Sequence, residues 1–252
     1  MKRFSCGLVL AVLGLPAIAQ AQTVDEFGAY RPPSTIRRES KQSAAVELRF
    51  GPYNPRVDSA FSHATPFRDT FGTDNRYLFG VEADWQILRL PHIGSLGPGF
   101  GWGYTRATAK ARLTLNPSQF SAEDTSLSVM PLYAVAVFRA DGPMRDSGIP
   151  LVPYAKLGLG AALWWASTGD NTSRENGVLG RGTSYGLQYA LGLMLLLDPL
   201  DRQTAKDADN SLGLNHSYIF GEWYMSDLNG FSGSNRMNVG AHTWVLGLAM
   251  EF

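Results

Sequence analysis

Large apolar side chains occupy every second position over the last nine residues of the chain, at Trp244, Leu246, Leu248, Met250 and Phe252. The residues between them are small or polar. A period of two predicts a β-strand with one apolar face. The strand runs to the final residue without a polar tail, which is typical of a last strand that closes a barrel against the first.

The same alternation recurs along the chain and predicts eight strands. Connections after the first, third, fifth and seventh strands are long, including one at 106–126, and the others are shorter. This alternation predicts an all-β, eight-stranded antiparallel up-and-down transmembrane β-barrel over residues 43–252. The strands are expected at Ala44–Tyr53, Arg76–Leu88, Leu96–Thr105, Leu127–Arg139, Val152–Trp165, Thr183–Leu197, Leu214–Met225 and Ala241–Phe252.

Charged residues alternate with the apolar ones and are expected to face the barrel interior. An eight-stranded barrel is just filled by its own side chains. Acids and bases inside it need partners, so we interpret this lumen polar cluster as a structural set of salt bridges. A proton or ion path and an active site are the alternatives. The cluster comprises Glu47, Arg49, Glu82, Asp84, Lys156, Glu222 and Glu251.

Aromatic residues gather late in the odd strands and early in the even ones. If the first strand rises from the inner side, both sets lie at the outer rim, as an aromatic girdle requires. The predicted girdle consists of Tyr77, Trp102, Tyr104, Trp165, Tyr185 and Trp244. The same periodicity in strand three opposes three aromatic residues to a row of glycines, which would make room for bulky side chains inside the barrel.

The N-terminus has the pattern of an export signal. A basic start, an apolar run and Ala19-Gln-Ala21 predict a cleaved signal peptide at 1–21, followed by a flexible polar segment at 22–42. The only cysteine, Cys6, lies inside the signal, so we expect no disulfide or thiol chemistry in the mature protein.

The amino-acid composition agrees with the predicted barrel and adds little to it. Twenty-two basic and 22 acidic residues balance, which argues against a nucleic-acid partner, and a charged fraction of 17% suits strands that face lipid. The four histidines are scattered without ligand spacing, so we expect neither a metal site nor a cofactor.

Two internal segments resemble a known group of proteins. Glu47–Asp58 and Asn215–Glu222 are similar to segments of an uncharacterised myxobacterial-type family of small bacterial outer-membrane β-barrel proteins. The alternating residues from Trp244 to Phe252 resemble the C-terminal assembly signal of that class. The resemblance implies the outer membrane of a Gram-negative cell, with outer-membrane lipid and the barrel assembly machinery as partners, and it implies no activity.

Three functions remain open. The first is a non-enzymatic outer-membrane β-barrel: a structural protein, a binder of an unknown surface ligand, or a very narrow pore. The second is a lipid-acting outer-membrane enzyme with His216 and Glu222 as weak catalytic candidates, which share a strand face while Ser217 points to the opposite one. The third is a soluble periplasmic lipocalin-like binding barrel. The faces of strand seven are the least clear.

Overall fold

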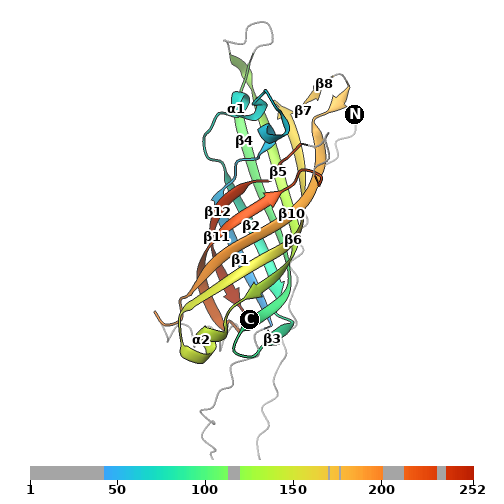
Figure 1. Ribbon diagram of the computed structural model, residues 1–252. Helices are drawn as coiled ribbons and strands as arrows, with labels where there is room; N and C mark the ends of the chain where they lie inside the picture. The colour runs from blue at the N-terminus through green and yellow to red at the C-terminus, as the bar shows by residue number, and fades with distance from the viewer. Residues whose placement is uncertain (1–42, 113–119, 170, 176, 201–212, 232–236) are drawn as a thin grey trace, which may run out of the picture. The chain divides into compact units, whose positions relative to one another are not determined.

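The computed structural model of the protein describes residues 43–112, 120–169, 171–175, 177–200, 213–231 and 237–252. The predicted signal peptide and the polar segment at 22–42 lie outside the described residues. Within them, eight long strands pair antiparallel with their neighbours around a closed barrel (Figure 1). The predicted eight-stranded antiparallel barrel is therefore confirmed.

The barrel follows chain order, and β12 closes it against β1. Backbone N–H groups of Ser43 and Ala44 donate to the carbonyl of Phe252 at 2.9 and 3.2 Å. The long strands are β1 (Ala44–Pro52), β2 (Tyr77–Trp85), β4 (Gly94–Arg112), β5 (Phe120–Arg139), β6 (Leu151–Thr168), β10 (Arg181–Leu196), β11 (His216–Asp227) and β12 (His242–Glu251).

Short elements cover the two ends of the barrel. The loop end carries η1 (Val57–Ala60), α1 (Pro66–Phe71) and the small strands β7 (Asn171–Thr172), β8 (Arg174–Glu175) and β9 (Val178–Leu179). The turn end carries β3 (Leu88–Leu90), α2 (Gly142–Ser147) and the C-terminus (Figure 1). No helix in the described residues is long and apolar enough to cross a membrane.

The connection predicted as a loop at 106–126 is mostly strand. β4 continues to Arg112 and β5 begins at Phe120, and the hairpin projects beyond the barrel at the loop end (Figure 1). Thr105 and Ala107 are buried whereas Arg106 and Thr108 are exposed, so the alternation persists with small and polar residues. Backbone pairing holds these residues in strands although they carry little apolar surface.

The connection after the fourth strand, predicted to be one of the shorter ones, contains the helix α2. Gly148 ends this helix in the left-handed conformation, with φ of 67°, which a glycine adopts without steric cost. Asp141 precedes it and is buried, accepting a hydrogen bond from Ser95 Oγ at 3.2 Å and pairing with Arg145 at 3.0 Å. Burial raises the pKa of the Asp141 carboxyl, and Arg145 and Ser95 offset part of that rise.

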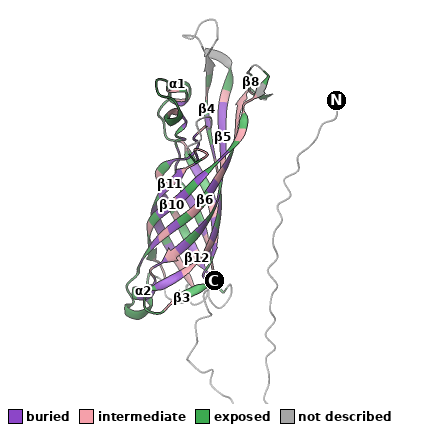
Figure 2. Ribbon diagram, turned by 45° about the vertical axis from the view of Figure 1, so that its right-hand side comes forward, coloured by how far each residue is buried: buried purple, intermediate pink, exposed green. Residues whose placement is uncertain are grey.

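Apolar side chains cover the outside of the barrel, and exposed and buried residues alternate along its strands (Figure 2). Phe79 and Phe100 are each 55% exposed, and Leu157 and Leu191 are 63% and 62% exposed. The faces of β11 are now clear. Tyr218, Glu222 and Tyr224 point inward with the other even residues, whereas Ile219 and Trp223 point outward.

β5 differs from strands in which only the outward face is apolar, because its inward face is also apolar. Val129, Tyr133 and Val135 are buried in the interior, while the outward face carries Leu132 and small alanines. The glycines of β4 make this possible. A Cβ on Gly101 would overlap the ring of Tyr133, which lies across the β4 backbone.

Candidate functional site

Eight charged side chains meet in the middle of the barrel, and each is at most 4% exposed. They project from six of the eight long strands, and the two remaining strands, β4 and β10, contribute glycines and uncharged residues to the inward face. The buried charge cluster is defined as Glu47 and Arg49 of β1, Glu82 and Asp84 of β2, Arg139 of β5, Lys156 of β6, Glu222 of β11 and Glu251 of β12.

Two cations share one set of three carboxylates. Arg49 donates to Glu47 at 2.8 Å, to Glu82 at 2.6 Å and also to Glu222. Lys156 Nζ lies 2.7 Å from both Glu47 and Glu82, and 3.5 Å from Glu222. Glu47 and Glu82 are directly opposite each other in the β1–β2 register, where two like charges repel unless cations lie between them.

Arg139 forms the second centre of the cluster. Its guanidinium contacts Asp84 at 2.6 Å, Glu251 at 2.9 Å and Glu47 at 3.2 Å. Glu47 therefore contacts all three cations and joins the two centres into one network. Because the partners come from β1, β2 and β12, Arg139 also ties the first strand to the last.

Uncharged side chains donate further hydrogen bonds to the carboxylates of the cluster. Tyr133 donates to Glu82 at 2.7 Å, Tyr154 to Glu222 at 2.8 Å and Tyr218 to Glu251 at 3.0 Å. Gln86 donates a further hydrogen bond to Glu251 at 2.7 Å. Each of these donors is itself buried, so the hydrogen bonds exclude water from the carboxylates.

Apolar layers close the barrel on both sides of the cluster. Towards the loop end, Tyr53, Val129 and Val239 are 0% exposed, and the Tyr53 hydroxyl donates to the Val239 carbonyl at 2.8 Å. Towards the turn end, Met144 of α2 packs against Tyr218. These side chains leave almost no surface to water, so the described residues fill the barrel at both levels.

The formal charges of the cluster do not cancel. Three cations face five carboxylates, which gives a formal charge of −2. Atoms of Glu47, Glu82 and Asp84 lie within 4.8 Å of one another, a spacing that a metal ion could bridge. The same carboxylates are already bound by Arg49, Arg139 and Lys156, so the arrangement provides mutual pairing of side chains.

All seven residues of the predicted lumen polar cluster lie in this interior, and the structure brings them together in one network. The sequence pattern did not assign Arg139 or the three tyrosine donors to the cluster. The position of Arg139 on β5 carried a usable signal, because Arg139 follows Tyr133, Val135 and Val137 at steps of two and must share their face. The apolar character of that face concealed its inward orientation.

The two weak catalytic candidates lie far apart. His216 is at the turn end, where its Nδ1 lies 2.5 Å from Asp198 Oδ2. Glu222 is buried against Arg49, Tyr154 and Lys156. Six residues along a strand separate them by roughly 20 Å. They therefore do not form a shared site.

The predicted girdle residues lie on the outer wall towards the loop end. Tyr77, Trp102 and Trp244 are 55%, 42% and 48% exposed. Tyr104 and Trp165 contact each other with ring centroids 6.3 Å apart. Four residues of the predicted assembly signal, Trp244, Leu246, Leu248 and Phe252, are exposed on the outer wall of β12 and at its end, and Met250 is half-buried.

The sequence matches no family model and no curated protein. Among solved structures, the chain is similar to Ail, the attachment invasion locus protein of Yersinia pestis, with 14% identity, 84% of this chain and 97% of that chain covered, and a TM-score of 0.41. OprG of Pseudomonas aeruginosa gives 13% identity, coverage of 83% and 96%, and a TM-score of 0.46. The N-terminal β-barrel domain of Pseudomonas aeruginosa OprF gives 11%, 84% and 100%, and 0.33. These likenesses concern the barrel fold, and the resemblance to the myxobacterial-type family stays a prediction.

Proposed function

We propose that the protein is a non-enzymatic barrel of the bacterial outer membrane whose interior serves as a structural core and conducts no ions. The exposed apolar wall suits hydrocarbon, because a closed barrel satisfies its backbone hydrogen bonds without water. The observation that carries the proposal is the buried charge cluster, enclosed between apolar layers. Of the structural, surface-binding and pore alternatives, this favours the first two.

Conductance across planar lipid bilayers tests the closed interior. The full mature chain is folded in detergent and inserted in bilayers in concentrated KCl, and we expect no current steps above the baseline. Insertion is verified in vesicles of the same lipid by a folded band that migrates differently on unboiled and boiled gels. Reproducible unitary conductance from protein that shows this band would overturn the proposal.

Membrane residence has its own test. We expect the exported chain to stay with the outer-membrane fraction and to require detergent for extraction. A monomer that remains in solution without detergent would refute the membrane assignment and favour the soluble lipocalin-like alternative.

The lipid-acting alternative has little geometric support, because His216 and Glu222 lie at different levels of the barrel. We expect that His216→Ala and Glu222→Gln leave the lipid species of the outer membrane unchanged when measured by mass spectrometry. A species that appears with the wild-type protein and disappears with either folded variant would show enzymatic activity.

A further inference from the structure

The outward face of β4, β5, β6 and β10 carries a polar row near the loop end. Strand register aligns Arg106 of β4 with Ser128 of β5, Ser128 with Trp165 of β6, and Trp165 with Arg181 of β10. We call these four residues the arginine row. Arg106 and Arg181 are exposed at the two ends of a line that crosses four strands, Trp165 between them is half-buried, and Ser128 is buried at 2% exposure.

Directly below the arginine row, the outer wall is apolar and hollowed. Ala134 and Ala161 occupy outward positions that larger residues fill elsewhere, and they leave a hollow of about 590 Å³. Leu132, Leu159 and Tyr185 form its sides. We call this space the alanine groove.

Phe231 forms a further wall of the alanine groove from the loop between β11 and β12. Its ring lies 5.8 Å from the Tyr185 ring, and its φ of 56° is uncommon for a residue with a Cβ. The Gly230 amide donates to the Tyr185 carbonyl at 2.8 Å and fixes the loop on the barrel exterior. The groove is therefore bounded by β4, β5, β6, β10 and the loop between β11 and β12.

A second hollow lies on β6 and β10 beside Trp165 and Arg181, and its Leu163 and Thr183 are two residues from Ala161 and Tyr185 of the groove. It measures about 490 Å³, and Leu163, Trp165, Arg181, Thr172 and Thr183 line it. Polar atoms thus replace apolar ones on passing from the alanine groove towards the loop end. This order matches an amphipathic ligand whose apolar part lies in the alanine groove and whose polar part lies towards the loop end.

The two arginines of the row are available to an anion. Arg181 is exposed and makes no ion pair with any side chain that the structure describes, and Arg106 donates to Ser126 Oγ at 3.1 Å. Asp124, four residues from Ser128 along β5, is paired with Lys110 at 3.2 Å. The charge of the arginine row is therefore complementary to an anionic headgroup.

We propose that the arginine row and the alanine groove together bind one phosphorylated glycolipid of the outer leaflet. Guanidinium groups bind phosphate through paired hydrogen bonds. The Trp165 indole offers a flat amphipathic face for a sugar ring, and the groove accommodates an acyl chain. Arg106 and Arg181 are three strand spacings apart, roughly 14 Å at about 4.8 Å per strand, which suits a disaccharide headgroup that carries a phosphate at each end.

The position of the groove along the membrane normal agrees with the acyl-chain region of the outer leaflet. Ser128 and Ala134 are six residues apart on β5, about 20 Å along the strand. With a tilt of about 40°, this corresponds to roughly 15 Å along the membrane normal, half of a hydrocarbon core about 30 Å thick. The inference rests on the membrane location proposed above, and it adds a ligand to the outer wall without involving the interior.

Native mass spectrometry of the full mature chain, released from detergent, tests the inference. The probes are hexa-acylated lipid A with two phosphates, the same lipid A after enzymatic removal of both phosphates, and dioleoyl phosphatidylglycerol. We expect one bisphosphorylated lipid A per barrel, with the two other lipids bound at least about tenfold more weakly, because paired charge-assisted hydrogen bonds to phosphate are lost.

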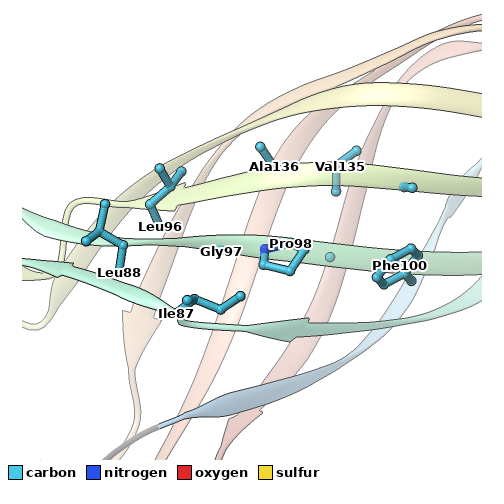
Figure 3. Close-up of a pocket in the computed structure, with 10 residues that line it drawn as sticks. Ile87, Leu88, Leu96, Gly97, Pro98, Phe100, Val135 and Ala136 are labelled. Atoms are coloured by element: carbon cyan, nitrogen blue, oxygen red, sulfur yellow. The ribbon is translucent and has the colours of Figure 1, made fainter.

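Two variants with matched controls locate the site. Arg181→Gln and Ala161→Leu should each weaken binding of the bisphosphorylated lipid A by about tenfold, the first through the phosphate and the second by filling the alanine groove. Arg68→Gln removes an exposed arginine on α1 and should leave binding unchanged. Ala136→Leu fills a separate hollow of about 480 Å³ near the turn end, where Pro98 and Ile87 also lie, and should likewise have no effect (Figure 3).

Several outcomes would overturn the inference. Equal binding of phosphatidylglycerol would show a general preference for anionic lipid, and equal binding of dephosphorylated lipid A would remove the role of the arginines. Unchanged binding by folded Arg181→Gln or by folded Ala161→Leu would place the lipid elsewhere. The heat-modifiable band checks folding of every variant. A barrel that stays closed to ions but binds no lipid A would refute this inference and leave the proposed function intact.

Discussion

Replacing Arg49 with methionine tests whether the buried charge cluster stabilises the barrel. Arg49 is 2% exposed and contacts Glu47, Glu82 and Glu222. Methionine is unbranched and fills much of the same space, but it cannot donate a hydrogen bond. Arg49→Met therefore removes three charge-assisted hydrogen bonds and changes the formal charge of the cluster from −2 to −3. Lys156 is left as the one cation within reach of all three carboxylates.

The expected cost follows from the burial of these carboxylates. Removing one partner of a buried ion pair typically costs about 3–5 kcal/mol, because the remaining charge stays desolvated. We expect the free energy of unfolding to fall by about 4 kcal/mol. Adding Glu222→Gln returns the formal charge to −2, and the double variant should be about 1–2 kcal/mol more stable than the sum of the two single effects predicts.

Urea unfolding of the protein folded in phospholipid vesicles measures these free energies. Tryptophan fluorescence follows the transition, unboiled gels confirm the folded fraction, and equal slopes indicate comparable unfolding. Arg68→Gln serves as an exposed control and should shift stability by less than about 0.5 kcal/mol. A cost below about 1 kcal/mol for Arg49→Met, or strict additivity in the double variant, would refute a structural role for the cluster.

Three further changes have defined outcomes. Gly101→Ala places a methyl group against Tyr133 and should lower the free energy of unfolding by about 1–3 kcal/mol, whereas Gly221→Ala has more space and should cost less in the same urea titration. Phe252→Ala should reduce the assembled fraction in cells, measured by heat-modifiable gels, while protein refolded in vitro keeps its stability; equal assembly would contradict the predicted assembly signal. The pKa of Asp141 is raised by burial, so the folded state binds this proton more tightly than the unfolded state, and the stability that the protonated carboxyl contributes decreases as pH rises from the unfolded to the folded pKa. As pH rises through this interval, Asp141→Asn should therefore gain stability relative to the wild type. A pH-independent difference in the free energy of unfolding between the two proteins would refute the raised pKa of Asp141.

The barrel was predictable because its exterior strands obey a strict period of two. On β6, outward Leu157, Leu159 and Leu163 alternate with inward Lys156 and Gly160, and the sequence pattern alone assigns both faces. Burial of a single face therefore suffices to identify the strand, its orientation and the polar residues that enter the interior.

The pattern failed where both faces of a strand have the same character. On β5 the inward valines resemble a lipid-facing row, so Arg139 was not assigned to the cluster although it shares their face. The hairpin beyond Thr105 was predicted as a loop for the opposite reason, since the small and polar residues on both of its faces resemble a loop. Neither the hairpin nor the set of partners of Glu47 could be predicted, because register between strands sets both.

Closure of β1 against β12 has a consequence for the order of folding. Residues at the two ends of the barrel sequence must meet, and pairing at such separation is the slowest kind of contact to form. Arg139 binds Glu47 on β1 and Glu251 on β12, so its ion pairs become complete only when these strands join. An open sheet would keep the charged face hydrated, and closure would remove that water in one step. We therefore expect the cluster to stabilise the closed barrel, because separating β1 from β12 would break the ion pairs of Arg139 with Glu47 or Glu251.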